Sequence, residues 1–258
     1  MDLGLTGKVA MVAAASKGIG FATAKLLAAE GCLVSICARN EEQLEAAAAE
    51  IGEETRSYIV DVSNAEDLEW WFSQTLEDLG APSILVTNTG GPKAGPVGSL
   101  TDEDWQGGVD STLMNVVRLV RLVQPGMTEA GWGRIVHITS LVAREPAKLL
   151  PISSTLRAGL LALTKLQALE VAAHGVTVNA VLPGHTRTDR QTHLAQVRAD
   201  REGITLEESM ANGEREIPTG RFAEPEEVAA AIAFLCGAPA SSITGQSLLV
   251  DGGLVRGL

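Results

Sequence analysis

Short runs of apolar residues alternate along the chain with longer segments in which apolar residues recur at helical spacing. The run KVAMVAA at 8–14 predicts a buried strand, and GIGFATAKLLAAEG at 18–31 predicts the helix that follows it. The same alternation continues to the end of the chain. Further strands are predicted at 32–38, 57–62, 83–88, 134–140, 176–183 and 246–253. Further helices are predicted at 41–52, 65–80, 104–129, 152–174 and 224–236.

The predicted strands are nearly continuous runs of apolar residues, which indicates that both of their faces are covered. Strands and helices alternate throughout, and this predicts an α/β fold with one doubly wound, parallel sheet of about seven strands and helices on both faces. No linker or long repeat interrupts the pattern, so residues 1–258 are predicted to form a single domain. The charged, weakly helical segment 184–218 follows a strand, and we expect it to be a substrate lid.

Composition and charge argue against several classes of function. The chain has 258 residues, a mass of 27.0 kDa and a formal net charge of −12, which does not suit a nucleic-acid-binding surface. No signal peptide and no bilayer-spanning run is present, so we expect a cytoplasmic protein with no membrane partner. Its three cysteines are expected to be reduced and buried. Neither they nor the four histidines have metal-ligand spacing, so no metal is expected.

The loop AAASKGIG at 13–20 joins the first predicted strand to the first predicted helix. Gly18 and Gly20 allow the backbone to approach a ligand closely, and the N-terminus of the helix offers free N–H groups to a pyrophosphate. An ordinary tight turn would show the same two glycines. Ala14 occupies a position where glycine would permit positive φ, and we expect the turn to form with negative φ instead.

This loop and later segments resemble the short-chain dehydrogenase/reductase family, whose fingerprint here is Thr-Gly-x-x-x-Gly-x-Gly. The resemblance runs from end to end and implies a Rossmann fold that binds a nicotinamide dinucleotide. It includes TNTG at 87–90, GRIVHITS at 133–140, VNAVLPG at 178–184 and ITGQSLLVDGG at 243–253. The cofactor-binding residues that it implies are Ser16, Lys17, Gly18, Ile19, Gly20, Arg39, Asp61, Val62, Asn88, Gly90, Arg157, Pro183, Gly184 and Thr188.

The end of the second predicted strand indicates which cofactor is preferred. A carboxylate at this place would bind the ribose 2′-hydroxyl of NAD, but the chain reads Cys37-Ala38-Arg39. The Arg39 guanidinium can bind a 2′-phosphate, and Lys17 can add a second positive charge. In the resembling family such a basic pair goes with NADP. We therefore expect NADP(H) as the preferred cofactor, with NAD as the alternative.

The family resemblance also implies a catalytic tetrad of Asn, Ser, Tyr and Lys, in which the tyrosine exchanges a proton with the substrate oxygen. Ser140 matches the serine. Ser153 and Arg157 stand at the positions of the tyrosine and the lysine, and Thr112 stands at that of the asparagine. The only tyrosine, Tyr58, lies on the third predicted strand. The conventional Tyr–Lys mechanism is therefore not expected.

Other residues are candidates for this chemistry. Ser153 and Arg157 lie one helical turn apart and share a face, although a helix-cap role and a packing role are their alternatives. Arg157 can bind ribose hydroxyls or polarise a carbonyl oxygen, but it cannot donate a proton. His185, directly after the Pro-Gly turn, is the candidate acid because imidazole titrates near neutral pH. His137 lies within a predicted strand and is expected to be structural.

Three functions are consistent with these residues. The first is an NADP(H)-dependent oxidoreductase that transfers hydride between the nicotinamide and a carbonyl/alcohol substrate, similar to 3-oxoacyl-(acyl-carrier-protein) reductases, with an atypical proton donor. The second is a redox-neutral elimination or isomerisation, and the third is non-catalytic cofactor binding. The retained nucleotide loop favours the first, with a small molecule or an acyl thioester as substrate. Charged lid residues such as Arg187 and Arg190 suit an anionic substrate and a solvated helix face equally.

Association is expected as well. In the resembling family, the helices corresponding to 104–129 and 152–174 pair across a two-fold axis. The helix face LLALTKLQALEVA at 160–172 is more apolar than contact with one sheet requires. We therefore expect a homotetramer or a homodimer.

Overall fold

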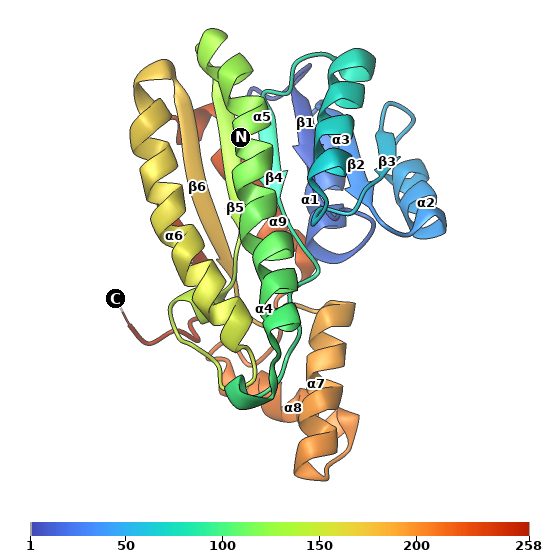
Figure 1. Cartoon of the computed structure of the whole chain (residues 1–258), viewed down its shortest axis with the longest axis vertical. Coiled ribbons are helices and arrows are strands. Elements are labelled where there is room, and N and C mark those ends of the chain that lie inside the picture. The colour runs from blue at the N-terminus through green and yellow to red at the C-terminus, as the bar shows by residue number, and fades with distance from the viewer. Residues whose placement is uncertain (1, 258) are drawn as a thin grey trace.

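Seven parallel strands form one sheet at the centre of the molecule (Figure 1). The computed structural model describes residues 2–257. The strands are β1 (Val9–Val12), β2 (Leu33–Ala38), β3 (Arg56–Ile59), β4 (Ile84–Thr87), β5 (Gly133–Ile138), β6 (Val176–Pro183) and β7 (Ser247–Val250). Each neighbouring pair is parallel, in the order β3-β2-β1-β4-β5-β6-β7. The predicted parallel sheet is confirmed.

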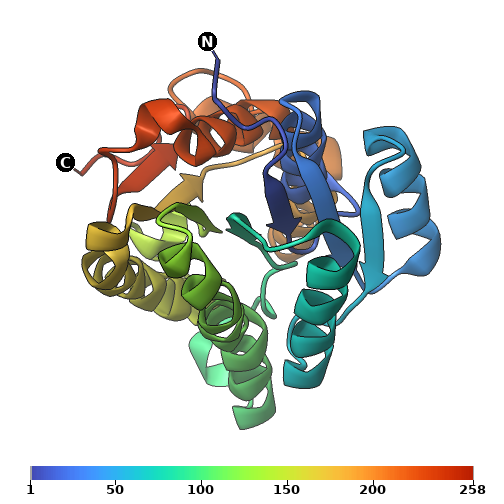
Figure 2. The same cartoon turned by 90° about the horizontal axis from the view of Figure 1, so that it is seen from above.

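Helices cover both faces of this sheet, as Figure 2 shows from above. The helices are α1 (Gly18–Ala29), α2 (Glu41–Ile51), α3 (Ala65–Leu79), α4 (Asp102–Gly108), α5 (Asn115–Glu129), α6 (Pro151–Val171), α7 (Asp189–Glu202), α8 (Leu206–Glu216) and α9 (Pro225–Cys236). One apolar layer packs α1, α2 and α9 against the sheet, and the other packs α3, α5 and α6. The doubly wound architecture is confirmed. None of the helices that the structure describes is long and apolar enough to cross a membrane.

Two predicted elements differ in detail. The predicted helix at 104–129 begins at Asp102, after a capping box formed by Thr101 and Asp104, and a π-helical turn at Val109–Met114 separates α4 from α5. Strand β3 ends at Ile59, although the pattern extended it to residue 62. The Val60 N–H still donates to Ala38 O of β2 at 3.0 Å, and the next N–H, at Asp61, donates to a side-chain oxygen of Asp67 at 2.8 Å.

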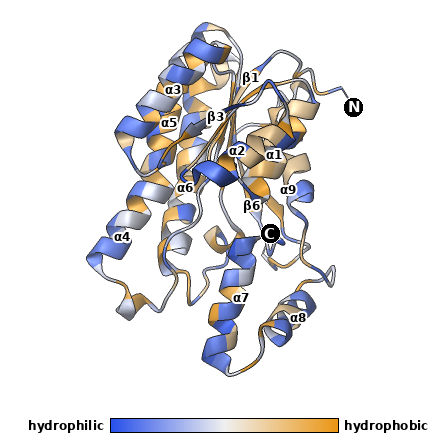
Figure 3. Ribbon diagram, turned by 90° about the vertical axis from the view of Figure 1, so that its right-hand side faces the viewer, coloured by the Kyte–Doolittle hydropathy of each residue, from blue (hydrophilic) through white to orange (hydrophobic). Residues whose placement is uncertain are grey.

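The lid segment, residues 184–218, contains two helices rather than an irregular loop. Threonine side chains cap both of them: Thr188 accepts a hydrogen bond from Gln191 N in α7, and Thr205 accepts one from Glu208 N in α8. The pair extends beyond one end of the sheet (Figure 1), and α7 is predominantly hydrophilic (Figure 3). The threonine caps therefore stabilise the starts of two helices that the weak apolar pattern of the segment did not clearly indicate.

All three cysteines, Cys32, Cys37 and Cys236, are free thiols in the apolar interior, as expected. Burial raises the pKa of the Cys32 and Cys37 thiols to about 12, with Glu30 contributing at Cys32. These thiols therefore stay protonated at neutral pH and are unreactive.

His137 is fully buried in the central strand β5. Its Nδ1 lies 2.9 Å from the Thr87 hydroxyl, and its Nε2 lies 3.0 Å from Gln167 Oε1. If the amide oxygen of Gln167 accepts from Nε2, then Nδ1 accepts from the threonine and both nitrogens are satisfied in the neutral ring. Burial lowers the pKa of His137 to about 4, partly offset by the Gln167 hydrogen bond. This environment agrees with the structural role predicted from its place in a strand.

The low pKa of His137 should make stability depend on pH. The unfolded imidazole, with a pKa near 6.5, takes up a proton before the folded one, near 4, so stability is present above pH 6.5 and is lost as the pH falls towards 4. We expect a loss of about 2 kcal/mol in the free energy of unfolding between pH 7 and pH 5. Urea denaturation at both pH values measures it. A His137→Gln variant should show little of this loss, and an equal loss in the variant would assign it to another group.

The turn between β1 and α1 reverses the backbone at a single residue. The Ala13 N–H donates to Val86 O in β4, whereas the Ala15 N–H donates to Cys37 O in β2. In a regular strand these two N–H groups would point to the same side, so the chain must reverse at Ala14. Its φ is +48°, which shows that the expected negative φ was wrong. The left-handed conformation costs an alanine about 1–2 kcal/mol.

An Ala14→Gly variant should therefore be more stable than the wild type. Glycine relieves the left-handed strain but loses more backbone entropy on folding, so we expect a net gain of about 0.5–1 kcal/mol and a rise in Tm of about 1–4 °C. Thermal unfolding without cofactor measures this change. An Ala15→Gly variant, where φ is not positive, is the control and should lose stability. A similar loss in Ala14→Gly would contradict the strain.

Candidate functional site

Most of the predicted site residues lie at the carboxyl ends of four neighbouring strands. The strand order reverses between β1 and β4, and ligands of open α/β sheets bind outside the strand ends at such a point. The residues at these strand ends are the loop 13–20 after β1, Asn88 and Gly90 after β4, Ser140 after β5, and Pro183 and Gly184 at the end of β6. The fold thus brings segments far apart in sequence to one edge.

The loop after β1 has the shape of a cradle for a pyrophosphate. Helix α1 begins at Gly18 without a side-chain cap, so its first N–H groups are not satisfied by the preceding residue. The Asn88 amide donates to Ala14 O at 3.2 Å and fixes the loop against β4. A Cβ at Gly20 would lie 2.5 Å from that carbonyl oxygen, so only glycine fits there. The residues present therefore fit a dinucleotide phosphate at the helix N-terminus.

Basic residues lie beside this cradle. Arg39 is highly exposed, with 78% of its side chain accessible, and its Nη1 lies 3.9 Å from Asp61 Oδ2. Lys17 donates to Asp189 Oδ2 at 2.7 Å, so its charge is shared with the lid. Val62 follows Asp61 and is half-buried. Arg39 is thus the cation free to meet a 2′-phosphate without breaking a close ion pair.

Ser153 and Arg157 form one unit on α6. The Arg157 Nε donates to Ser153 Oγ at 3.1 Å, and its Nη1 donates to the carbonyl oxygens of Ile138 at 3.0 Å and Thr139 at 2.6 Å. Only 6% of Arg157 is exposed. Burial, followed by repulsion from Arg190, lowers the pKa of Arg157 to about 10, so its charge is kept at neutral pH. The shared face predicted for the two residues is confirmed.

Ser140 directly follows Thr139, at the end of β5 that Arg157 holds through hydrogen bonds. Its Oγ accepts a hydrogen bond from Val142 N at 3.3 Å, which leaves the hydroxyl hydrogen available to a substrate oxygen. Thr112 lies buried in the π-helical turn between α4 and α5, and its hydroxyl has no partner among the described residues. The Asn115 Oδ1 one turn later has none either. Asn115 was not singled out by the sequence analysis, because the helical pattern does not reveal the π-helical turn.

The start of helix α7 lies against the cradle. The side chain of Thr188 approaches Gly18 so closely that a Cβ there would lie 3.2 Å from Thr188 Cγ2. The Arg190 Nη2 donates to Pro92 O at 2.9 Å, and its guanidinium covers the backbone of Gly91. Arg190 was not among the predicted site residues. The sequence placed it only among the charged lid residues that suit an anionic substrate and a solvated helix face equally.

At the base of the lid segment, His185 is held on two sides. Its Nδ1 lies 3.1 Å from Gln191 Oε1, and its ring meets that of Phe222 edge to face at 5.9 Å between centroids. No hydrogen bond within the described chain joins it to Ser140 or Arg157. The structure therefore places the His185 ring against α7 and Phe222, outside the group formed by Ser140, Ser153 and Arg157.

Tyr58, and Lys148 in the loop after Ser140, are not part of this group of residues. The Tyr58 hydroxyl donates to Asp78 Oδ2 at 2.6 Å, and burial together with Asp78 raises its pKa. Strand β3 is four strand spacings from β5, roughly 19 Å. Lys148 is exposed. Within residues 2–257, no group of three or more His, Cys, Asp or Glu side chains is arranged to hold a metal ion.

Comparisons with known proteins agree with this geometry. Residues 13–255 match the family model of the enoyl-(acyl-carrier-protein) reductases. The 3-oxoacyl-(acyl-carrier-protein) reductase FabG of Vibrio cholerae is 33% identical over 252 residues, which cover 98% of this chain and 99% of that protein.

Two solved structures are similar over almost their whole length. A variant of the actinorhodin polyketide ketoreductase with NADPH has a TM-score of 0.94 and 34% identity, covering 97% of this chain and 98% of that one. The L-sorbose reductase of Gluconobacter frateurii, complexed with NADPH and L-sorbose, has a TM-score of 0.94 and 32% identity, with both chains covered completely. On this match of sequence, fold and nucleotide cradle, the chain belongs to the short-chain dehydrogenase/reductase family.

Proposed function

We propose that this protein is an NADP(H)-dependent oxidoreductase that interconverts a carbonyl group and an alcohol. The observation that carries the proposal is the cradle at α1, in which an uncapped helix N-terminus, Gly20 and the Asn88 bond leave room for a dinucleotide phosphate. The similar proteins include a 3-oxoacyl-(acyl-carrier-protein) reductase and two ketoreductase-type enzymes whose structures contain NADPH. A ketone, sugar or 3-oxoacyl thioester is the substrate class that these relatives support.

Arg39 supports NADP(H) over NAD(H). It lies beyond the end of β2, where a carboxylate would favour the unphosphorylated ribose, and its nearest acidic partner is 3.9 Å away. A guanidinium can bind a phosphate with two parallel hydrogen bonds. Lys17 adds positive charge nearby if its bond to Asp189 opens on binding.

Residues of this chain stabilise the developing charge and donate the proton, while the cofactor supplies the hydride. Bound NADPH supplies the hydride. Ser140 donates a hydrogen bond to the carbonyl oxygen, and the Arg157 charge stabilises the negative charge that develops there. Ser153, held by Arg157 Nε, adds a second hydroxyl in place of the family's tyrosine. The proton needed to convert the alkoxide to the alcohol comes, in this proposal, from His185, whose ring is fixed by Gln191.

The test first measures binding and then turnover. Fluorescence titration should show tighter binding of NADPH than of NADH, and Arg39→Ala should weaken NADPH binding about tenfold while leaving NADH nearly unchanged. A panel of 3-oxoacyl thioesters and small ketones is then added, and oxidation of NADPH is followed by absorbance. Steady oxidation with at least one substrate is the expected outcome. His185→Gln should lower kcat by about 10²-fold or more.

Other outcomes select among the alternatives. Tight NADPH binding without oxidation would favour a non-catalytic or redox-neutral protein, and the absence of binding would refute cofactor use. Undiminished turnover in His185→Gln would remove His185 as the proton donor while leaving the oxidoreductase proposal in place.

We further propose that the protein forms a homodimer or a homotetramer. Leu166 and Leu169 on α6 are 64% and 70% exposed, and Leu248 on β7 is 40% exposed. Large apolar side chains gathered on one helix are typical of a buried interface. Light scattering should therefore give a mass of two or four chains of 27.0 kDa. A Leu166→Glu, Leu169→Glu double variant should shift the mass towards one chain, and a wild-type mass of one chain would refute the proposal.

A further inference from the structure

Two guanidinium groups lie beyond the carboxyl ends of the neighbouring strands β4 and β5. Arg157 reaches the last residues of β5 through Ile138 O and Thr139 O. Arg190 reaches the loop after β4 through Pro92 O. Strands β4 and β5 are neighbours in register, so these two loops lie side by side. The charge of Arg190 is close enough to lower the pKa of Arg157, second to the effect of burial.

Among the described residues, neither guanidinium has an acidic partner. Every hydrogen-bond acceptor of Arg157 and Arg190 among these residues is a serine hydroxyl or a backbone carbonyl. The ion pairs within residues 2–257 include neither side chain. Two positive charges that are partly removed from water and lack a counter-ion lower the stability of the fold, and a bound anion would relieve this cost.

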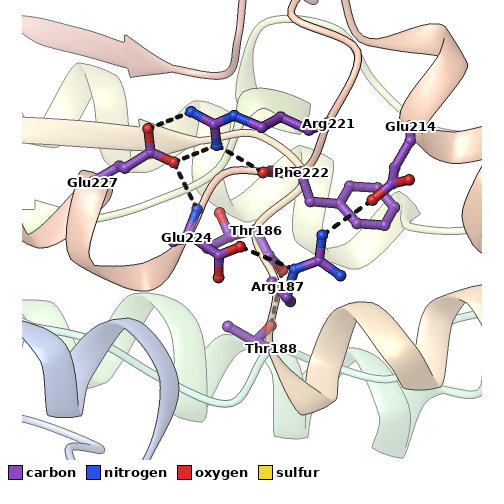
Figure 4. A network of polar contacts seen from close by, with 8 residues as sticks. All are labelled: Thr186, Arg187, Thr188, Glu214, Arg221, Phe222, Glu224 and Glu227. Carbon is purple, nitrogen blue, oxygen red and sulfur yellow. Dashed lines mark hydrogen bonds and ion pairs between the residues drawn. The ribbon is translucent and has the colours of Figure 1, made fainter.

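Other arginines in and beside the lid segment form ion pairs with glutamates. Arg187, three residues before Arg190, donates to Glu214 Oε1 at 3.1 Å and to Glu224 Oε1 at 3.0 Å (Figure 4). Arg221 forms a two-fold contact with Glu227 in the same network. These arginines are neutralised where they hold the base of the lid. Arg157 and Arg190 differ from these two arginines of the lid segment in having no acidic partner among the described residues.

Free donors remain on both groups. Arg157 uses Nε and Nη1, and Arg190 uses only Nη2, so Arg157 Nη2 and Arg190 Nε and Nη1 make no hydrogen bond to the described chain. Planar guanidinium groups bind carboxylates through parallel N–H bonds. Two of them, one from the core and one from the lid, can hold both oxygens of one carboxylate.

We propose that Arg157 and Arg190 together bind a free carboxylate of the substrate, so that the preferred substrate is an oxo acid or hydroxy acid rather than a neutral ketone or ester. The inference rests on the oxidoreductase function proposed above and names its substrate class. Because α7 carries Arg190 while α6 carries Arg157, a bound carboxylate joins the lid to the core. Arg157 then positions the substrate as well as stabilising charge at its carbonyl oxygen.

An equilibrium experiment tests this independently of turnover. Protein saturated with NADP⁺, which cannot reduce a ketone, is titrated calorimetrically with acetoacetate and with methyl acetoacetate. The wild type should bind the acid at least about tenfold more tightly than the ester. Arg190→Gln should bring this ratio close to one, and Arg190→Lys should retain part of it because the charge remains. Arg198→Gln, on the same helix, is the matched control and should keep the full ratio.

Each contrary result has a distinct meaning. Failure to bind NADP⁺ would refute the proposed function before the carboxylate is tested. Equal binding of acid and ester by the wild type, or an unchanged ratio in Arg190→Gln, would overturn the carboxylate site. A fall in NADP⁺ affinity in Arg190→Gln with the acid/ester ratio retained would show that the anion is a cofactor phosphate, and would also overturn it. Arg190 is half-buried, so the variants can be verified as folded by thermal unfolding.

Discussion

The direction of the strands is the constraint on which this site depends. Because all seven run parallel, every carboxyl end lies at the same edge, and each crossover returns the chain to the opposite edge before the next strand begins. The cradle after β1, the Asn88 loop after β4 and the Ser140 turn after β5 are thereby brought together from distant parts of the sequence. Helices on both faces bury the sheet and keep these ends in fixed register.

Charge is distributed unevenly over this frame. The protein carries a formal net charge of −12, yet four basic residues lie around the cradle: Lys17, Arg39, Arg157 and Arg190. Asp189 pairs with Lys17 and Asp61 lies near Arg39, whereas Arg157 and Arg190 are desolvated and have no acidic partner among the described residues. A local positive region in an acidic protein attracts anions. Both a phosphorylated dinucleotide and a substrate carboxylate would satisfy it.

In our proposal, Ser153 and Arg157 take the places of the family's tyrosine and lysine, and they stabilise the substrate oxygen in a different way. Arginine keeps its charge, and its Nε–Oγ contact fixes the serine rotamer, so the pair is rigid. Such a pair is better suited to holding negative charge than to delivering a proton. Proton delivery is thereby separated from charge stabilisation, and in our proposal it moves to His185 at the base of the lid, which is tied to α7 through Gln191.

Local patterns were enough to predict the strands, the helices and the buried thiols, because each depends on neighbours within one element, and the alternation of strands and helices predicted the parallel sheet. The nucleotide loop was predicted from the family resemblance, because its two glycines alone would also fit an ordinary tight turn. They could not predict the positive φ of Ala14, which two hydrogen bonds to different strands impose, or the π-helical turn beside Thr112. Arg190 was indistinguishable in sequence from a solvated lid residue. Only the crossovers of the sheet bring its contact at Pro92 beside the end of β5 that Arg157 holds, because these segments are separated along the chain by a distance that carries no periodic signal.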